Sequence, residues 1–369
     1  MGAREFTMGV EEEYQLIDPD TRALSPQSLS VLPAAHVDGN ELIQPELHTS
    51  QVEIGTPICA NLADVRAELI ALRREVIAAA ERQGARLGAA GTHPFSRWED
   101  QEITPRERYR MLEDHYQHVA RETVTFGSHV HIGIEDPDAV IEIINRARMW
   151  IPPLVALAAS SPYWYGADTG YASFRTEIVR RWPLSDVPQR FESRRDYDAL
   201  VRDLVAAGCI EDATQIYWDM RPSDRYSTFE FRATDVCMSV DETVMIAGLV
   251  QGLVRTCWTE ADRGLEPSST RPELLLAAKW RASRYGLSGD LVDLRSARAV
   301  PAATMIAALL EYLRPALEEA GEFEEISWLV YETMRRGTGA QRQREAFARS
   351  GRLEDVVDLI MEETAKSSA

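Results

Sequence analysis

The sequence has few cysteines and no long apolar run. Its 369 residues include only four cysteines, and no two of them show C-x-x-C spacing. A zinc ribbon, a redox pair or a disulfide framework is therefore not supported, and a reducing compartment is expected. No stretch approaches the roughly 18 uninterrupted apolar residues of a membrane span, and the N-terminus lacks the apolar segment of a secretory signal. We expect a cytoplasmic protein without a membrane partner.

Basic residues are also in short supply. The chain carries 40 lysines and arginines against 59 aspartates and glutamates, a formal net charge of −19. Such a charge repels the phosphates of nucleic acids and anionic lipid headgroups, so neither is expected as the main partner. A nucleotide can still bind if metal ions bridge carboxylates to its phosphates. Small-molecule substrates are the expected partners, and the sequence is compatible with a homo-oligomer.

Three familiar site motifs are missing. The sequence contains no Gly-x-x-x-x-Gly-Lys-Ser/Thr, no Gly-x-Gly-x-x-Gly after a strand and no Gly-x-Ser-x-Gly. A phosphate-binding P-loop, a dinucleotide-binding fold and a nucleophile-elbow hydrolase are therefore not indicated.

Patterns of apolar residues predict an α+β protein with a mainly antiparallel sheet, because the strands do not alternate regularly with helices. The expected strands span residues 6–16, 41–54, 85–91, 123–134, 214–221 and 226–236, the last two joined as a hairpin. The expected helices span residues 62–83, 104–122, 137 to about 153, 194–207, 240–258, 271–285, 302–320, 323–336, 341–349 and 353–365. One domain is expected over residues 1–369, strand-rich over about 5–236 and largely helical over about 237–366.

Two helix starts show clear capping signals. Asn61 precedes the apolar stripe of residues 62–83 and is expected to cap that helix. Thr104 and Glu107 form a capping box with Pro105 at the first helical position, which predicts a second helix beginning there.

Acidic residues occupy one side of the first expected strand. Alternation places Glu11 and Glu13 on the same face, about 7 Å apart, a spacing that suits a divalent cation bound by oxygen ligands. A solvated outer face of the strand is the alternative. Two acids on a strand are therefore a weak signal until further ligands join them.

Further acids lie on the segment 41–54. Glu53 stands among apolar neighbours, so it either joins a polar site or faces water. Glu46 and His48 have the opposite parity from Glu53. They reach the same site only if Pro45 or a bulge resets the register of the strand.

Two more strands carry side chains suited to metal and phosphate. Strand alternation places His129 and His131 on the same face, and this H-x-H pattern is typical of a metal or phosphate site. The alternative is one core histidine beside an incidental neighbour. Glu230 and Arg232 also share a face, the carboxylate suited to Mg²⁺ and the guanidinium to phosphate, with a solvated cross-strand ion pair as the alternative. Together the strands predict a sheet face that gathers carboxylates around divalent metal and phosphate.

Seven ordered motifs cover about residues 5–365 of the chain. They are Gly9-Val10-Glu11-Glu12-Glu13-Tyr14, residues 46–57 ending in Glu53-Ile54-Gly55-Thr56-Pro57, Gly127-Ser128-His129-Val130-His131-Ile132-Gly133, Asp168-Thr169-Gly170-Tyr171-Ala172-Ser173-Phe174-Arg175, Phe229-Glu230-Phe231-Arg232, Lys279-Trp280-Arg281-Ala282-Ser283-Arg284-Tyr285-Gly286 and Gly337-Thr338-Gly339-Ala340-Gln341-Arg342-Gln343-Arg344. In this order they resemble the type 2 glutamate–cysteine ligase family of carboxylate–amine ligases. The resemblance implies a glutamine-synthetase-like fold, in which a curved, mostly antiparallel sheet forms a funnel for ATP and two or three Mg²⁺ ions, with Mn²⁺ as an alternative metal.

The resemblance also implies roles for individual residues. The expected metal ligands are Glu11, Glu13, Glu46, Glu53, His129 and Glu230. The side chains expected to hold the ATP–metal complex are Glu11, Glu13, Glu53, His131, Glu230, Lys279 and Arg344. His129 and Arg232 are the expected catalytic residues, with Arg232 stabilising the transferring phosphoryl group. The expected substrate contacts are Tyr171, Arg175, Arg281 and Arg284.

The implied activity is ATP-dependent ligation. In this family a carboxylate, typically the γ-carboxylate of glutamate, is phosphorylated by ATP, and an amine such as that of cysteine attacks the acyl phosphate. Ala277-Ala278 stand where the family pattern has Glu-Asn, so another amino acid or amine remains an open choice. A phosphagen-kinase-like phosphotransferase and a non-catalytic nucleotide or metal sensor on a ligase scaffold are the alternatives.

Overall fold

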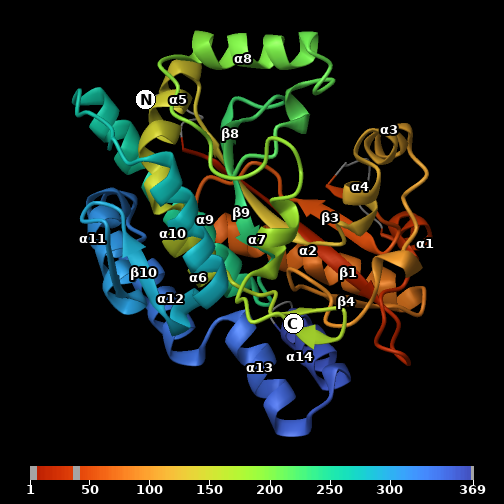
Figure 1. Ribbon diagram of the computed structural model, residues 1–369. Coiled ribbons are helices and arrows are strands. Elements are labelled where there is room, and N and C mark those ends of the chain that lie inside the picture. Colours follow the sequence, from red (N-terminus) through yellow and green to blue (C-terminus); the bar gives the residue numbers. More distant parts are fainter. Residues whose placement is uncertain (1–5, 36–41, 367–369) are drawn as a thin grey trace.

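A seven-stranded antiparallel sheet organises the computed structural model, which describes residues 6–35 and 42–366 (Figure 1). Its strands are β1 (Met8–Ile17), β2 (Ile43–Pro45), β3 (Gln51–Gly55), β4 (Arg86–Gly88), β5 (Gly127–Gly133), β8 (Met220–Pro222) and β9 (Thr228–Asp235). They follow the order β2-β3-β1-β5-β9-β8, and β4 also pairs with β1. All these pairs are antiparallel, so the predicted α+β class with its antiparallel sheet is confirmed.

Helices pack behind the sheet and around its edges (Figure 1). Before β8 they are α1 (Ser28–Ala34), α2 (Leu62–Arg82), α3 (Glu107–Tyr116), α4 (His118–Glu122), α5 (Pro137–Ala147), α6 (Ile151–Leu157), α7 (Phe174–Val179) and α8 (Arg194–Ala206). After β9 they are α9 (Val240–Asp262), α10 (Pro272–Tyr285), α11 (Ala302–Ala320), α12 (Phe323–Arg336), α13 (Gly339–Ser350) and α14 (Leu353–Lys366). Two small hairpins, β6 (Tyr163–Trp164) with β7 (Ala167–Asp168) and β10 (Asp290–Asp293) with β11 (Arg298–Pro301), lie outside the main sheet.

One face of the sheet is apolar and is covered by α2 and α9. Alternate strand residues pack against these helices, among them Val10, Ile54, Val130 and Phe231, each at most 1% exposed. Because side chains alternate along a strand, the residues between them point to the opposite face. That opposite face carries the polar residues. Within residues 6–35 and 42–366, no helix combines the length and the apolar composition of a membrane span.

The two predicted helix starts have different outcomes. The Asn61 side chain accepts a hydrogen bond from the Asp64 N–H at 2.9 Å and caps α2, as predicted. The capping box at Thr104 is wrong, because the Thr104 hydroxyl donates instead to the Glu46 carbonyl at 2.5 Å and α3 begins at Glu107. The predicted helix 104–122 is also divided in two, since Gln117 has a φ of 50°.

Several predicted strands are shorter in the structure. Segment 41–54 forms two strands, β2 and β3, separated by residues 46–50, while Glu41 lies outside the described residues. The strand predicted at 123–134 begins at Gly127, and that predicted at 85–91 is reduced to residues 86–88. Residues 213–215 form a 3₁₀ turn capped by the Asp212 carboxylate rather than the start of a strand, so the hairpin pairs only 220–222 with β9.

A buried ion pair joins the sheet to its helical layer. Glu12 lies on the apolar face of β1, and its carboxylate contacts the Arg73 guanidinium of α2 at 2.5 and 2.9 Å; neither side chain is exposed. Arg73 also donates to the carbonyls of Met238 and Cys237, at 2.9 and 3.0 Å, and the Thr243 hydroxyl donates to Glu12 at 2.6 Å. The charge of Glu12 is thus partnered by groups from α2 and α9, and the charge of Arg73 also by the segment between β9 and α9.

We expect Arg73→Met to lower the free energy of unfolding by about 3–5 kcal/mol, because it leaves the Glu12 carboxylate buried without a partner. The double variant Glu12→Gln, Arg73→Met removes both charges and should recover part of that loss. Urea unfolding followed by tryptophan fluorescence measures both. The matched control is Arg86→Met, which removes an exposed ion pair with Glu81 and should change stability little. Equal losses in Arg73→Met and Arg86→Met would contradict a buried charge pair.

Candidate active site

Four adjacent strands place polar side chains on the open face of the sheet. They contribute Glu11 and Glu13 from β1, Glu53 from β3, His129 and His131 from β5, and Glu230 and Arg232 from β9. The register sets Glu11 opposite His129, Glu13 opposite Glu53 and His131 opposite Glu230. With Glu46, all of these residues line one cavity of about 330 Å³. The strand faces predicted for these residues therefore meet in a single place.

A register irregularity in β9 lies within this cavity. Val130 pairs with Phe231 and Ser128 with Thr234, so residues 232 and 233 of β9 together face one residue of β5. Such a bulge re-aims a side chain without ending the strand. Arg232 points into the cavity, whereas the Thr234 hydroxyl donates to the Ser128 carbonyl at 3.0 Å.

Glu11, His131 and Glu230 form a group that fits a metal ion. One ligand atom from each of the three lies within 4.8 Å of the others. Burial raises the pKa of Glu11, but hydrogen bonds to His129 and His131 outweigh it and hold this pKa well below its ordinary value. The Glu11 carboxylate is therefore ionised at neutral pH, as a cation ligand has to be.

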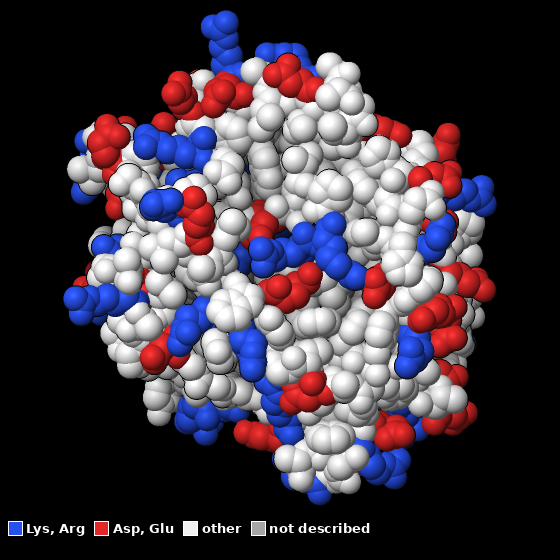
Figure 2. All heavy atoms as spheres, in the orientation of Figure 1, with Lys and Arg blue, Asp and Glu red and all other residues white. Residues whose placement is uncertain are grey.

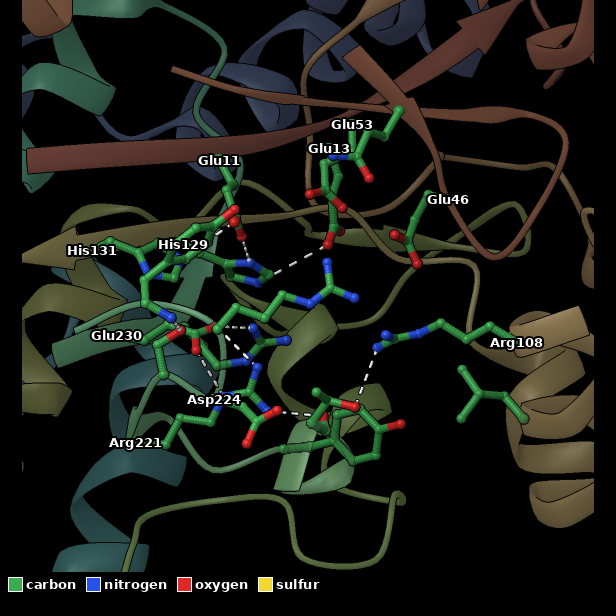
Figure 3. A pocket seen from close by; sticks show the side chains of 18 of the residues that line it. Glu11, Glu13, Glu46, Glu53, Arg108, His129, His131, Arg221, Asp224 and Glu230 are labelled. Atoms are coloured by element: carbon green, nitrogen blue, oxygen red, sulfur yellow. Dashed lines mark hydrogen bonds and ion pairs between the residues drawn. The ribbon is translucent and has the colours of Figure 1, made fainter. Parts of the chain in front are cut away.

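A second acidic group lies beside the first. Glu13, Glu46 and Glu53 line the cavity next to each other, and Figure 3 shows their carboxyl groups converging there. Burial and the charge of Glu13 raise the pKa of Glu46 to about 7. Burial and the charges of Glu11 and Glu46 raise the pKa of Glu53 well above its ordinary value. Ionising all three acids would place like charges side by side, which a bound cation would neutralise.

Glu230 is held by arginines instead. Arg221 donates to both of its oxygens, at 2.8 and 3.1 Å, and Arg232 donates to it as well. Burial raises the pKa of Glu230, but the charges of Arg232 and Arg221 outweigh it and keep this pKa well below its ordinary value. Arg232 is thereby fixed at the border between the carboxylates and the open part of the cavity.

The cavity is also lined by residues that the sequence patterns did not assign to a site. They are Arg106, Arg108 and Tyr109 at the start of α3, and Arg221, Asp224, Arg225 and Tyr226 in the β8–β9 hairpin. Figure 3 shows Arg108 reaching toward the acids from across the cavity, and Figure 2 shows acidic and basic side chains side by side around a hollow in the middle of this face. The basic segment 106–110 was the available signal; the hairpin arginines were interpreted only as turn residues.

A smaller recess adjoins the cavity. We call it the inner recess; it has a volume of about 120 Å³ and shares Glu13, Glu46, Leu112, His129, Tyr217 and Arg232 with the cavity. Its remaining walls are Leu47, Gln51, Thr123, Thr125, Arg175, Val179 and Trp182. Arg175 therefore lines the inner recess but not the cavity, and Glu13, Glu46 and His129 line both.

The other predicted site residues lie elsewhere. Lys279 is buried and paired with Asp186 at 3.0 Å and Asp219 at 2.7 Å; it lines a cavity of about 40 Å³ together with Arg175 and Arg232. His48 is buried outside the cavity, with its ring nitrogens bonded to Gln51 and to the Arg121 carbonyl. Both are held by protein groups rather than facing the acids.

A separate surface group contains the remaining four. The Arg284 guanidinium lies 5.4 Å from the Tyr171 ring centroid, Arg344 pairs with Asp168 at 2.7 Å, and Arg281 donates to the Asp290 carbonyl at 2.7 Å. Neither Tyr171 nor these three arginines lines the cavity or the inner recess. The structure thus does not bring them to the acidic face.

Comparison with solved structures supports the fold. A glutamate–cysteine ligase from Francisella tularensis, in complex with AMP, superposes with a TM-score of 0.73 at 12% identity, covering 100% of this chain and 90% of that one. A bifunctional glutathione synthetase from Pasteurella multocida superposes with a TM-score of 0.69 at 14% identity over 99% of this chain and 53% of that one. At these identities the likeness concerns the fold alone.

Comparison of sequences identifies the family. Proteins named "Putative glutamate--cysteine ligase 2" are 40% identical in Rhodopirellula baltica, over 98% of both chains, and 38% identical in Solibacter usitatus, over 97% of this chain and 93% of the relative. The model of glutamate–cysteine ligase family 2 matches residues 7–359. The protein therefore belongs to glutamate–cysteine ligase family 2 and is a carboxylate–amine ligase of that type.

Proposed function

We propose that the protein uses ATP and Mg²⁺ to join the γ-carboxylate of glutamate to an amine, with cysteine as the first candidate and other amino acids or small amines as the next. The observation that carries this proposal is the juxtaposition of the Glu11–His131–Glu230 group with Arg232 in one cavity. Carboxylates that fit a cation next to a fixed guanidinium supply what phosphoryl transfer requires, namely positioning and charge neutralisation.

The acids divide into two sets of candidate metal ligands. Glu11, His131 and Glu230 would hold one ion, and Glu13, Glu46 and Glu53 a second. Mg²⁺ or Mn²⁺ bound there would neutralise the ATP phosphates as negative charge shifts toward ADP. Arg108 and Arg225 also line the cavity and would contact the same phosphates.

His129 connects the two acidic sets. Burial and the charge of Arg232 lower the pKa of His129, so its imidazole is neutral at pH 7. Nδ1 lies 3.0 Å from Glu11 and donates to it, which leaves the Nε2 lone pair facing Glu13 at 4.0 Å. His129 thereby orients Glu11 and offers a neutral ligand between the carboxylates.

In the reaction we propose, an oxygen of the substrate carboxylate attacks the γ-phosphorus of ATP, and the bond to the ADP oxygen breaks. The amine nitrogen then attacks the acyl carbon, phosphate leaves, and the amine loses a proton. Arg232 pairs with Glu230 at the cavity, and it would stabilise the negative charge of the transferring phosphoryl group and of the acyl phosphate.

The decisive test is product analysis of purified protein with Mg²⁺, ATP, L-glutamate and a panel of amines that includes cysteine. We expect ADP and a γ-glutamyl amide. A phosphorylated guanidine without an amide would instead indicate a kinase, and ATP binding without turnover across the panel would indicate a sensor.

Glu230→Gln should reduce ADP formation by roughly a hundredfold, since it removes a charge that both a cation and Arg232 require. Steady-state ADP release measures this loss. Glu345→Gln, on the exposed face of α13, is the matched control and should keep the wild-type rate. A wild-type rate in Glu230→Gln would refute the metal assignment.

Removal of divalent metal should stop ADP formation, and added Mg²⁺ or Mn²⁺ should restore it. In Glu53→Gln we expect restoration to need a higher Mg²⁺ concentration, because the second acidic set then has one charge fewer. Titration of activity with Mg²⁺ after treatment with EDTA measures both effects. Full activity in the presence of EDTA would exclude a metal-dependent reaction.

A further inference from the structure

The outer face of α12 exposes large apolar side chains next to one another. Trp328 is 56% exposed and Tyr331 61% exposed, and Met334 follows three residues later at 36%. Residues three apart on a helix are neighbours, so these side chains form one continuous patch. A single exposed apolar residue is ordinary, but adjoining large ones mark an interaction surface.

The packing of α12 fixes the direction of this patch. On the inner face, Ile326, Leu329 and Val330 are buried, and α12 contacts α9 and α11. A Cβ atom at Gly248 of α9 would lie 2.3 Å from the Ile326 side chain, so α12 packs directly on the backbone of α9. The helix therefore cannot turn about its axis to bury the patch without losing this close packing.

Opposite charges lie at the two ends of the patch. Glu324, Trp328, Tyr331 and Arg335 follow one another at spacings of four, three and four residues, as in the seam of a coiled coil, and we call these four residues the outer stripe. In the part of the chain that the structure describes, the Glu324 carboxylate has no ion pair or hydrogen bond. Arg335 pairs only along its own helix, with Glu332 at 2.6 Å. Both end charges are exposed and available to a partner.

The outer stripe is symmetrical about the point between residues 329 and 330. Trp328 and Tyr331 lie one and a half residues on either side of it, and Glu324 and Arg335 lie five and a half residues on either side. In a two-fold interface the same surface of both copies is in contact. Antiparallel contact between two such stripes brings Glu324 of each copy opposite Arg335 of the other, with the aromatic rings between them. The stripe is therefore complementary in charge to a second copy of itself.

We propose that the outer stripe is the interface of an antiparallel homodimer, in which α12 packs against α12 of a second copy. Tryptophan and tyrosine are typical of the centre of an interface, and charges at its rim determine the orientation of the partners. The 14 residues of α12 bury less than the roughly 800 Å² per partner of a standard interface, so the dimer dissociates on dilution, at roughly micromolar concentration. This inference does not depend on the proposed catalytic function.

The test reverses one charge at a time. Glu324→Arg places two arginines opposite each other at both ends of the interface, and Arg335→Glu places two acids there. We expect the wild-type protein to be a dimer at about 100 µM, well above a micromolar Kd, and each variant alone to be a monomer. An equimolar mixture of the two variants should form a heterodimer, because every end contact then pairs an arginine with a glutamate. Sedimentation velocity measures all three samples.

Two further variants separate the interface from a general effect of charge or folding. Glu192→Arg makes the same charge change at an exposed residue before α8, which lies far from α12 (Figure 1), and should remain dimeric. Trp328→Ala keeps all charges and should raise the dimer Kd at least tenfold. A monomeric wild-type protein at about 100 µM, dimers in both charge variants, or a mixture without heterodimer would each overturn the proposal.

Discussion

The arrangement of the site depends on the buried pair of Glu12 and Arg73. Strand β1 carries three consecutive glutamates, and alternation has to turn at least one of them toward the helical layer. The Arg73 guanidinium and the Thr243 hydroxyl donate to the one that is buried, and the carbonyls of residues 237 and 238 accept from Arg73 in turn. A shift of one residue would bury Glu11 and Glu13 together, without such partners. The ion pair therefore sets the register that places these two carboxylates in the cavity.

The cavity itself is divided by charge. Glu230 is paired with Arg221 and Arg232, whereas Glu13, Glu46 and Glu53 lie together, and burial and mutual repulsion raise the pKa values of Glu46 and Glu53. The arginine-bound end already has the charge balance that an anion needs, and the acidic end requires cations before it can accept phosphates. In the proposed reaction both halves would therefore be needed to bind a metal–nucleotide complex, despite the formal charge of −19 on the chain.

Alternation along single strands predicted the site residues whose direction depends only on the local sequence. Alternation alone placed Glu11 with Glu13 and His129 with His131, and the structure shows both pairs on the open face of the sheet. Glu46 could not be placed in this way, because residues 46–50 leave the strand and Thr104 holds the Glu46 carbonyl from a distant segment. The bulge at residues 232–233 and the approach of Arg108 likewise arise from pairings between segments far apart in the sequence. Such pairings produce no periodic pattern in the sequence of either segment.

The Ala277-Ala278 pair lies outside the site, with Ala277 exposed. Ala278 is fully buried in the core on α10, next to Lys279, and neither alanine lines the cavity or the inner recess. The side chains that border the carboxylates are instead Thr125 and Trp182 in the recess and Tyr226 at the hairpin. The Trp182 indole donates to Thr123 at 2.8 Å, so the recess wall is held by a buried hydrogen bond and its size is set by the fold. The hairpin side of the cavity is more open, because Tyr226 is 62% exposed.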